Sequence, residues 1–169
     1  MLESIPLKRE RRHLLKSRAT LVESKTPIAF IDIRFSAHAT EDPEKVKKAV
    51  YNLLPENLAG GVVFTNNVVS GHHGNPIILF GVRIKDGELI KAFIDKLSTN
   101  LSDLDKSILS GESSLVVEKN NLYLRLDKQA ALEDEFKLQK AAPIHIRIHF
   151  KRKDEKSIVE TCRELGLMT

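Results

Sequence analysis

The chain has 169 residues and a net charge of +4, with 41% apolar and 30% charged residues. This apolar fraction excludes a wholly disordered chain, and the length suits a single domain. Its one cysteine, Cys162, excludes an intramolecular disulfide. The sequence predicts no transmembrane helix, and its N-terminus lacks the apolar segment of a secretory signal, so we expect a cytoplasmic protein without a membrane partner.

The net charge is concentrated at one end of the chain. Residues 1–26 contain seven Lys or Arg and three Glu, which account for the whole charge of +4, so residues 27–169 are neutral. We therefore divide the chain into a basic N-terminal extension, 1–26, and a single domain, 27–169. The extension is compatible with a helix that Pro27 would end. A basic arm attracts nucleic acid irrespective of sequence, whereas a neutral body does not.

Apolar periodicity predicts alternating strands and helices from Pro27 onwards. Alternation of apolar and polar residues indicates strands, and apolar residues three and four apart indicate helices. The predicted strands are 28–39, 62–69, 77–84, the two arms of a hairpin over 114–127, and 144–150. The predicted helices are 43–54, 89–97, 102–109, 128–139 and 154–166.

Residues that favour caps and turns mark several of these boundaries. Asp42 before Pro43 is a typical helix start, Asp127 can cap the helix that follows it, and Gly166 suits a helix end. The hairpin turn is expected at 119–121, because its two asparagines tolerate a positive φ.

The order of the elements predicts an α+β fold. Consecutive hairpins and helices favour a two-layer sandwich, in which a mostly antiparallel sheet has helices on one face. Strict alternation in several strands implies that the other sheet face is polar. A polar open face is available to bind a ligand.

The outward-facing strand positions are rich in arginine and histidine. Such side chains suit single-stranded RNA, because guanidinium groups contact phosphates and stack on bases, and aromatic rings stack on bases too. The candidate RNA-binding residues on this face are Arg34, Arg83, Tyr123, Arg125, His145, Arg147 and His149. The alternative is a solvated face whose charges pair across strands, such as Asp32 with an arginine.

Two further segments are candidates for RNA contact. The loop GHHGNP has two glycines that bring backbone N–H groups close to a phosphate, with His72, His73 and Asn75 as donors. Its alternative role is a tight turn. Lys128 lies at a predicted helix N-terminus, where an anion is favoured; the alternative, a capped strand-to-helix junction, is the stronger of the two interpretations.

No arrangement of residues predicts catalysis, a cofactor or a metal. His72 and His73 are adjacent, so their side chains diverge, and no Cys or acidic residue lies at ligand spacing. The spacing of residues in the sequence also indicates no nucleophile–base pair, no paired carboxylates and no Gly-rich nucleotide loop. We therefore expect a protein that is not an enzyme; the alternative is a hydrolase with His72 or His73 as base.

Four segments resemble the archaeal predicted exosome-subunit, RNA-binding family: IDIRFSAHATEDPEKVKKAVYNLLP, GHHGNPI, LYLRLDKQAAL and PIHIRIHF. The resemblance covers roughly residues 28–150. It implies a fold like that of the fifth ribosomal protein of the large subunit, an archaeal source and an RNA-associated role. The family's motifs fall here on His72, His73, Gly74, Asn75, Pro76, Asp127, Lys128 and Gln129.

Together, the residues and the resemblance predict a non-catalytic RNA-binding protein. We expect it to be an accessory subunit in RNA processing or degradation, associated with the exosome, with RNA and other RNA-processing proteins as partners. The alternative is a homodimeric or assembly subunit that buries the open sheet face and makes little contact with RNA.

Overall fold

The computed structural model of the chain describes residues 26–152 and 154–169. The predictions for the basic extension, including the helix before Pro27, lie outside these residues except at Thr26. Within the described part of the chain, no helix is long and apolar enough to cross a membrane.

The structure alternates strands and helices in nearly the predicted order. The strands are β1 (Ile28–Ala37), β2 (Thr65–Ser70), β3 (Pro76–Ile84), β4 (Val117–Glu118), β5 (Asn121–Leu126) and β6 (Ile144–Phe150). The helices are α2 (Pro43–Leu53), α3 (Glu56–Ala59), α4 (Gly87–Asn100), α5 (Asp103–Gly111), α6 (Ser113–Val116), α7 (Lys128–Leu132) and α8 (Glu155–Glu164). The short helices α3 and α6 were not predicted.

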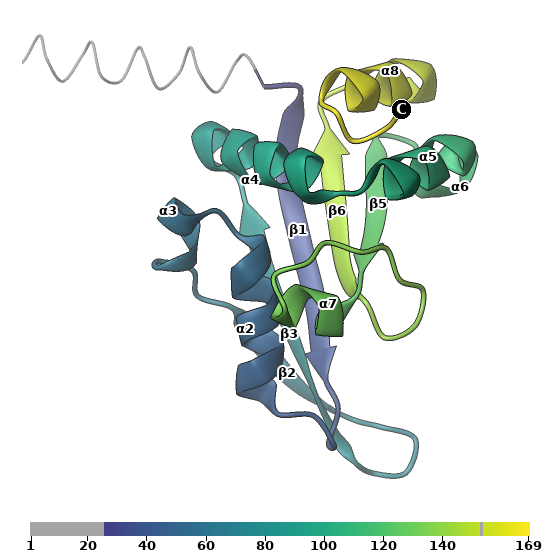
Figure 1. Ribbon diagram of the computed structural model, residues 1–169. Helices are drawn as coiled ribbons and strands as arrows, with labels where there is room; N and C mark the ends of the chain where they lie inside the picture. The colour runs from purple at the N-terminus through teal and green to yellow at the C-terminus, as the bar shows by residue number, and fades with distance from the viewer. Residues whose placement is uncertain (1–25, 153) are drawn as a thin grey trace, which may run out of the picture.

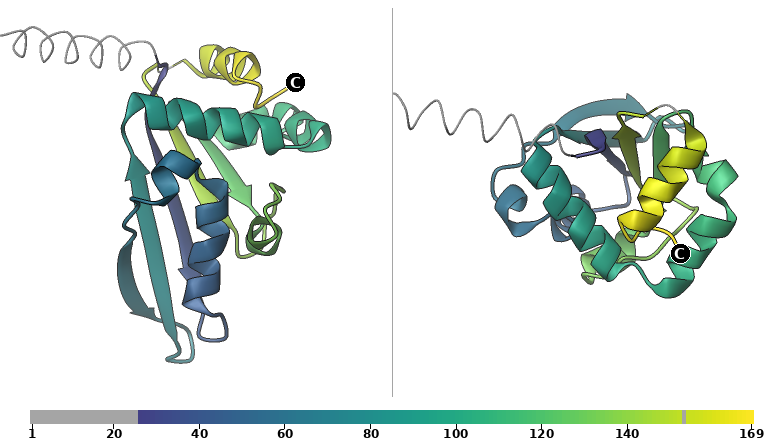
Figure 2. Two further views of the ribbon diagram at one scale, coloured as in Figure 1. Left: turned by 60° about the vertical axis from the view of Figure 1, so that its left-hand side comes forward. Right: turned by 90° about the horizontal axis from the view of Figure 1, so that it is seen from above.

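The six strands form one sheet in the order β2-β3-β1-β6-β5-β4, and every neighbouring pair is antiparallel. The strand β1 lies at the centre, and β3 lies between β1 and β2 (Figure 1). The helices cover one face of the sheet, as the view from above shows (Figure 2). The predicted two-layer α+β sandwich with one open sheet face is therefore confirmed.

The core lies between the sheet and the helices. In β1, Ile31, Ile33 and Phe35 point into it and are at most 3% exposed. Helix α2 contributes the apolar stripe that its sequence predicted, since residues three and four apart share one side of a helix. Cys162 of α8 is buried there, and burial raises the pKa of its thiol to about 12.

The predicted helix caps are confirmed. The side chain of Asp42 accepts a hydrogen bond from the Glu44 N–H at 3.0 Å. Asp127 accepts one from the Ala130 N–H at 2.7 Å and so fixes the junction between β5 and α7. Gly166 follows α8 with a φ of 76°, a conformation that glycine adopts without strain.

The predicted helix over 128–139 is wrong beyond Leu132. The chain turns at Asp134, which has a φ of 63°, and then runs back along the end of β5. The Gln139 N–H donates to the Arg125 carbonyl at 2.9 Å, and Leu138 forms a bridge with Leu126. Pairing of residues 138–139 with the end of β5 is favoured over a longer helix, because it satisfies backbone groups at the end of the sheet that a longer helix would leave unpaired.

The first arm of the predicted hairpin, 114–118, is largely wrong. Residues Ser113–Val116 form α6, and only Val117–Glu118 pair with β5. The turn consists of Lys119 and Asn120, with Lys119 at a φ of 55°, while Asn121 already belongs to β5. The predicted strand over 62–69 likewise starts three residues later, at Thr65.

Candidate nucleic-acid interface

The open face of the sheet carries every charged residue of the strands. In antiparallel pairing, residues directly opposite one another share a face, so the register defines rows across the sheet. The Asp32 row consists of Arg83, Asp32, Arg147 and Tyr123, from β3, β1, β6 and β5 in turn. The Arg34 row consists of Gly81, Arg34, His145 and Arg125 from the same strands. The remaining charged strand residue, Glu118 of β4, pairs with Asn121 on this face.

In the Asp32 row, two arginines share one carboxylate. Arg83 donates from Nε and Nη2 to the two oxygens of Asp32, at 2.6 and 2.9 Å, and Arg147 donates from Nη2 to the second oxygen. Burial disfavours the charged carboxylate, but the hydrogen bonds and charges of both arginines outweigh it and hold the pKa of Asp32 below its ordinary value. The alternative of an ion pair between Asp32 and an arginine is thus confirmed, for two arginines.

His149 is held by contacts within the protein. Its ring stacks on Phe30 with centroids 4.4 Å apart, and Arg83 lies 4.1 Å from the centroid of Phe30. Its ring nitrogens contact Asn121 Oδ1 at 2.8 Å and Asn120 Nδ2 at 3.1 Å. Burial, with the charges of Arg147 and Arg83, lowers the pKa of His149, which agrees with a neutral ring between an acceptor and a donor. Alternation in β1 predicts Phe30 on this face, but Phe30 was not among the predicted site residues.

The Arg34 row has no carboxylate at its centre. Arg34 and Arg125 are exposed, and neither guanidinium forms an ion pair with any residue that the structure describes. His145 lies between them, and burial together with the charges of Arg125 and Arg34 lowers its pKa. The opposing residue on β3 is Gly81, which has no side chain to cover Arg34. This row therefore presents free cationic groups around a neutral imidazole.

A groove of about 710 Å³ runs over the β5 side of this face. Arg34, Arg125, His145 and Arg147 line it together with Tyr123, and Leu115 of α6 and Glu118 complete its wall. Leu115 is 78% exposed and Tyr123 is 38% exposed, so both present apolar surface to the solvent. The groove combines cationic, apolar and carboxylate groups within a few strands.

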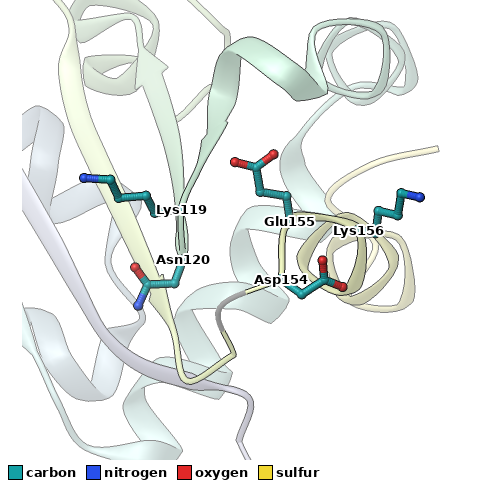
Figure 3. Close-up of a pocket in the computed structure, with 5 residues that line it drawn as sticks. All are labelled: Lys119, Asn120, Asp154, Glu155 and Lys156. Carbon is teal, nitrogen blue, oxygen red and sulfur yellow. The ribbon is translucent and has the colours of Figure 1, made fainter.

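A second hollow lies between the β4–β5 turn and the start of α8, where Lys119, Asn120, Asp154, Glu155 and Lys156 line it (Figure 3). Its two lysines are balanced by two carboxylates, and Asp154 caps α8 by accepting from the Ser157 N–H and hydroxyl. The described residues contain no group of three His, Cys, Asp or Glu that could hold a metal.

The predicted loop residues His72, His73 and Asn75 are exposed in the β2–β3 connection, which extends beyond the sheet at the end opposite α4 and α8 (Figure 1). The Gly71 N–H donates to the Asn75 carbonyl at 2.7 Å, and Gly74 has a φ of 76°. The loop is therefore a tight turn. Gly81 lies six positions after Asn75 along an extended strand, a distance of about 20 Å, so the loop and the Arg34 row are separate surfaces.

Lys128 is engaged by contacts within the protein. Its Nζ donates to the Ser36 carbonyl at 2.7 Å and to both carboxylate oxygens of Glu41 at 3.1 Å, and its side chain is only 11% exposed. These contacts tie the start of α7 to the end of β1 and the turn before α2.

Of the predicted site residues, the structure brings together on the open face Arg34, Arg83, Tyr123, Arg125, His145, Arg147 and His149.

Comparison with known proteins finds relatives over most of the chain. A family model described as RNA binding matches residues 30–150. The RNA-binding protein PAB1135 of Pyrococcus abyssi is 36% identical over 139 residues, in a match that covers 79% of this chain and 90% of that protein. An uncharacterized protein of Methanocaldococcus jannaschii is 34% identical over 147 residues, in a match that covers 79% of this chain and 97% of that protein.

Solved structures share the architecture. A DUF54 protein from Methanothermobacter thermautotrophicus superposes with a TM-score of 0.68 at 28% identity, over 82% of this chain and 97% of that one. The matched span contains the whole open face of the sheet, because the family model runs from β1 to the end of β6.

Proposed function

The chain belongs to the family described as RNA binding, and from this premise we propose that it binds RNA on the open face of its sheet without catalysing a reaction. The observation that carries this proposal is the Arg34 row, in which two exposed arginines flank His145 and have no acidic partner among the described residues. Arginines without a carboxylate are free to contact phosphate groups, which accept paired hydrogen bonds from a guanidinium.

The spacing of the row suits a nucleic-acid backbone. Arg34 and Arg125 lie two strands apart, so their Cα atoms are about 10 Å from each other. Arginine side chains are long enough to converge on one phosphate or to reach two successive phosphates from such positions. The paired arginines of the Asp32 row contribute less, because Asp32 already takes their hydrogen bonds.

Charge segregation explains how a neutral body attracts an anion. The strands place four arginines and only two carboxylates on the open face, so this surface is positive although residues 27–169 are neutral in total. The remaining acidic residues of the described chain lie in helices and loops. The basic extension 1–26 would add attraction that is independent of RNA sequence.

A non-catalytic role fits the surroundings of the histidines. His145 faces two arginines rather than a carboxylate that would orient it as a base, and both nitrogens of His149 have internal partners. The family resemblance further supports a cytoplasmic accessory subunit in RNA processing or degradation, associated with the exosome. Co-purification with exosome core subunits from an archaeal extract would test that association.

The double variant Arg34→Ala/Arg125→Ala tests the binding surface. We expect its affinity for RNA to fall about 100-fold at low salt, because two charge-assisted contacts are lost. The slope of log K against log salt should become shallower by about 1.4, or 0.7 for each charge lost. The control is Lys48→Ala/Lys91→Ala, which removes the same charge from exposed positions on helices α2 and α4. Equal affinities and slopes for the two variants would refute the proposal.

A second candidate function is a homodimer that buries the open face. The exposed Leu79 and Tyr123 favour it, because they place apolar surface on this face. Light scattering of the full chain without RNA distinguishes the two functions. A dimer that persists in the arginine double variant, together with no measurable RNA affinity, would favour the assembly role.

A further inference from the structure

The groove beside β5 has two ends with different chemistry. Arg34, His145 and Arg125 form its cationic end. At the other, apolar end Tyr123, Leu115 and Glu118 lie next to the ion pair that Arg147, opposite Tyr123 in the sheet, forms with Asp32. A nucleotide has the same division, since its phosphate is anionic while its base is flat, apolar on both faces and polar at the edge. The volume of about 710 Å³ is within the range of small-molecule sites.

The geometry points to a site for one unpaired guanosine nucleotide of the bound RNA, with its base on Tyr123, its Watson–Crick edge on Glu118 and its phosphate on Arg34 and Arg125. This inference rests on the proposed function and names the nucleotide that the same face selects.

The apolar end can hold a base by its faces. Tyr123 is 38% exposed and Leu115 is 78% exposed, and both line the groove. The other aromatic ring of this face, Phe30, is already covered by His149 and Arg83. Tyr123 is therefore the aromatic residue of the open strand face that is left to stack on a base, a contact that contributes about 1–3 kcal/mol.

Glu118 supplies the selectivity. Its pairing with Asn121 places it on the open face, diagonally adjacent to Tyr123 on the neighbouring strand. Asn121 donates to the Glu118 backbone carbonyl, but the Glu118 carboxylate makes no hydrogen bond or ion pair with residues 26–152 or 154–169. An ionised carboxylate only accepts hydrogen bonds, and guanine alone presents two adjacent donors, N1–H and N2–H, on its Watson–Crick edge.

The other bases fit this end poorly. Adenine and cytosine present one donor beside an acceptor nitrogen, and uracil presents one donor between two carbonyl oxygens, so each would set a lone pair against the carboxylate. A base-paired guanine uses the same edge for its partner. The site therefore requires an unpaired nucleotide.

The phosphate end lies at a matching distance. Arg125 is two residues from Tyr123 on the same face of β5, about 7 Å along the strand. Arg34 reaches the same region from β1 across His145. A base stacked on Tyr123 can thus leave its own phosphate beside both guanidinium groups.

Fluorescence anisotropy with labelled oligonucleotides tests the site. The probes are UUGUU, UUAUU, UUCUU and UUUUU, and UUGUU within a duplex. We expect the full chain to bind unpaired UUGUU about tenfold more tightly than the other probes, because the Glu118 carboxylate then accepts two hydrogen bonds from guanine. Glu118→Gln should lose this preference, because an amide offers both a donor and an acceptor. Tyr123→Leu should weaken every single strand about tenfold, and Tyr123→Phe should not.

The matched control is Glu155→Gln, which makes the same change in the separate hollow of Figure 3 and should retain the preference. Equal binding of all four single strands, or a preference that survives Glu118→Gln, would overturn the guanosine site and leave RNA binding in place. Tighter binding of the duplex would also overturn it. A failure of the proposed function looks different, since the wild type and the Arg34→Ala/Arg125→Ala variant would then bind every probe equally weakly.

Discussion

The Asp32 row and the Arg34 row lie side by side on the same face, two residues apart along β1, yet their arginines differ in availability. Arg83 and Arg147 are committed to Asp32, whose side chain is 6% exposed, and they cover Phe30 as well. Arg34 and Arg125 have no such partner among the described residues. The comparison shows that the residue opposite an arginine on the neighbouring strand determines whether its guanidinium is available to a ligand.

The residue on the central strand sets the difference. Because β1 has a neighbouring strand on both sides, the acid at position 32 neutralises one arginine on each of them, Arg83 on β3 and Arg147 on β6. An arginine at position 34 instead adds to the charge of Arg125 and disfavours protonation of His145 between them. We assign the first row to stability and the second to binding.

The largest expected effect on stability comes from Asp32→Asn. It leaves two guanidinium groups facing each other without a carboxylate, and we expect the free energy of unfolding to fall by about 2 kcal/mol, a value discounted because both arginines are partly exposed. Urea denaturation measures it. Arg34→Gln should change stability by less than about 0.5 kcal/mol, as for other exposed positions.

The pH dependence of stability should also reflect the assignment of the Asp32 row to stability. The pKa of Asp32 in the folded protein lies below its ordinary value of 3.8, so its stabilisation is present above that pH and is lost as the pH falls through the folded pKa. Asp32→Asn should remove this part of the acid sensitivity. An Asp32→Asn variant as stable as the wild type, or an Arg34→Gln variant that loses as much, would break the division into two rows.

A smaller loss of stability is expected from Lys128→Met. The variant keeps the length of the side chain but removes its bonds to the Ser36 carbonyl and Glu41, which should cost about 1 kcal/mol. RNA affinity should stay unchanged, because the Lys128 ammonium group is already bonded to the Ser36 carbonyl and to Glu41. Thermal unfolding measures the stability and an RNA titration measures the affinity. The control is Lys137→Met, which makes the same change at an exposed lysine. Weakened binding with unchanged stability would return Lys128 to the RNA-binding surface.

The smallest expected effect is the pH dependence of RNA affinity. Burial and the charges of Arg125 and Arg34 lower the pKa of His145 below 6.5 in the free protein. A phosphate beside the imidazole would raise that pKa, so binding takes up a proton and strengthens as the pH falls. We expect about a threefold gain between about pH 7.5 and 5.5. His145→Gln should flatten the profile. A wild-type affinity that is constant or falls over this range would contradict the role of His145.

Much of the open face could be predicted from the sequence. Alternation in the predicted strands correctly gathered Arg34, Arg125 and His145 on one face, and the ion pair of Asp32 with an arginine was one of the expected alternatives. Which arginine is paired and which is free could not be predicted, because that depends on the register between strands far apart in the chain. Glu118 was missed because its strand is only two residues long and follows an unpredicted helix.

The sequence by itself determined the α+β class, the capped starts of α2 and α7 and the side of each long strand that faces the core, because these follow from local periodicity and local hydrogen bonds. Only the tertiary structure decided the strand order, the return of the chain after Leu132 and the sharing of Asp32 by two arginines. These depend on contacts between residues distant in the chain, such as position 32 with positions 83 and 147. Counting charges along the sequence shows that residues 27–169 are neutral, and only the register shows that one face of this neutral body carries a cationic row.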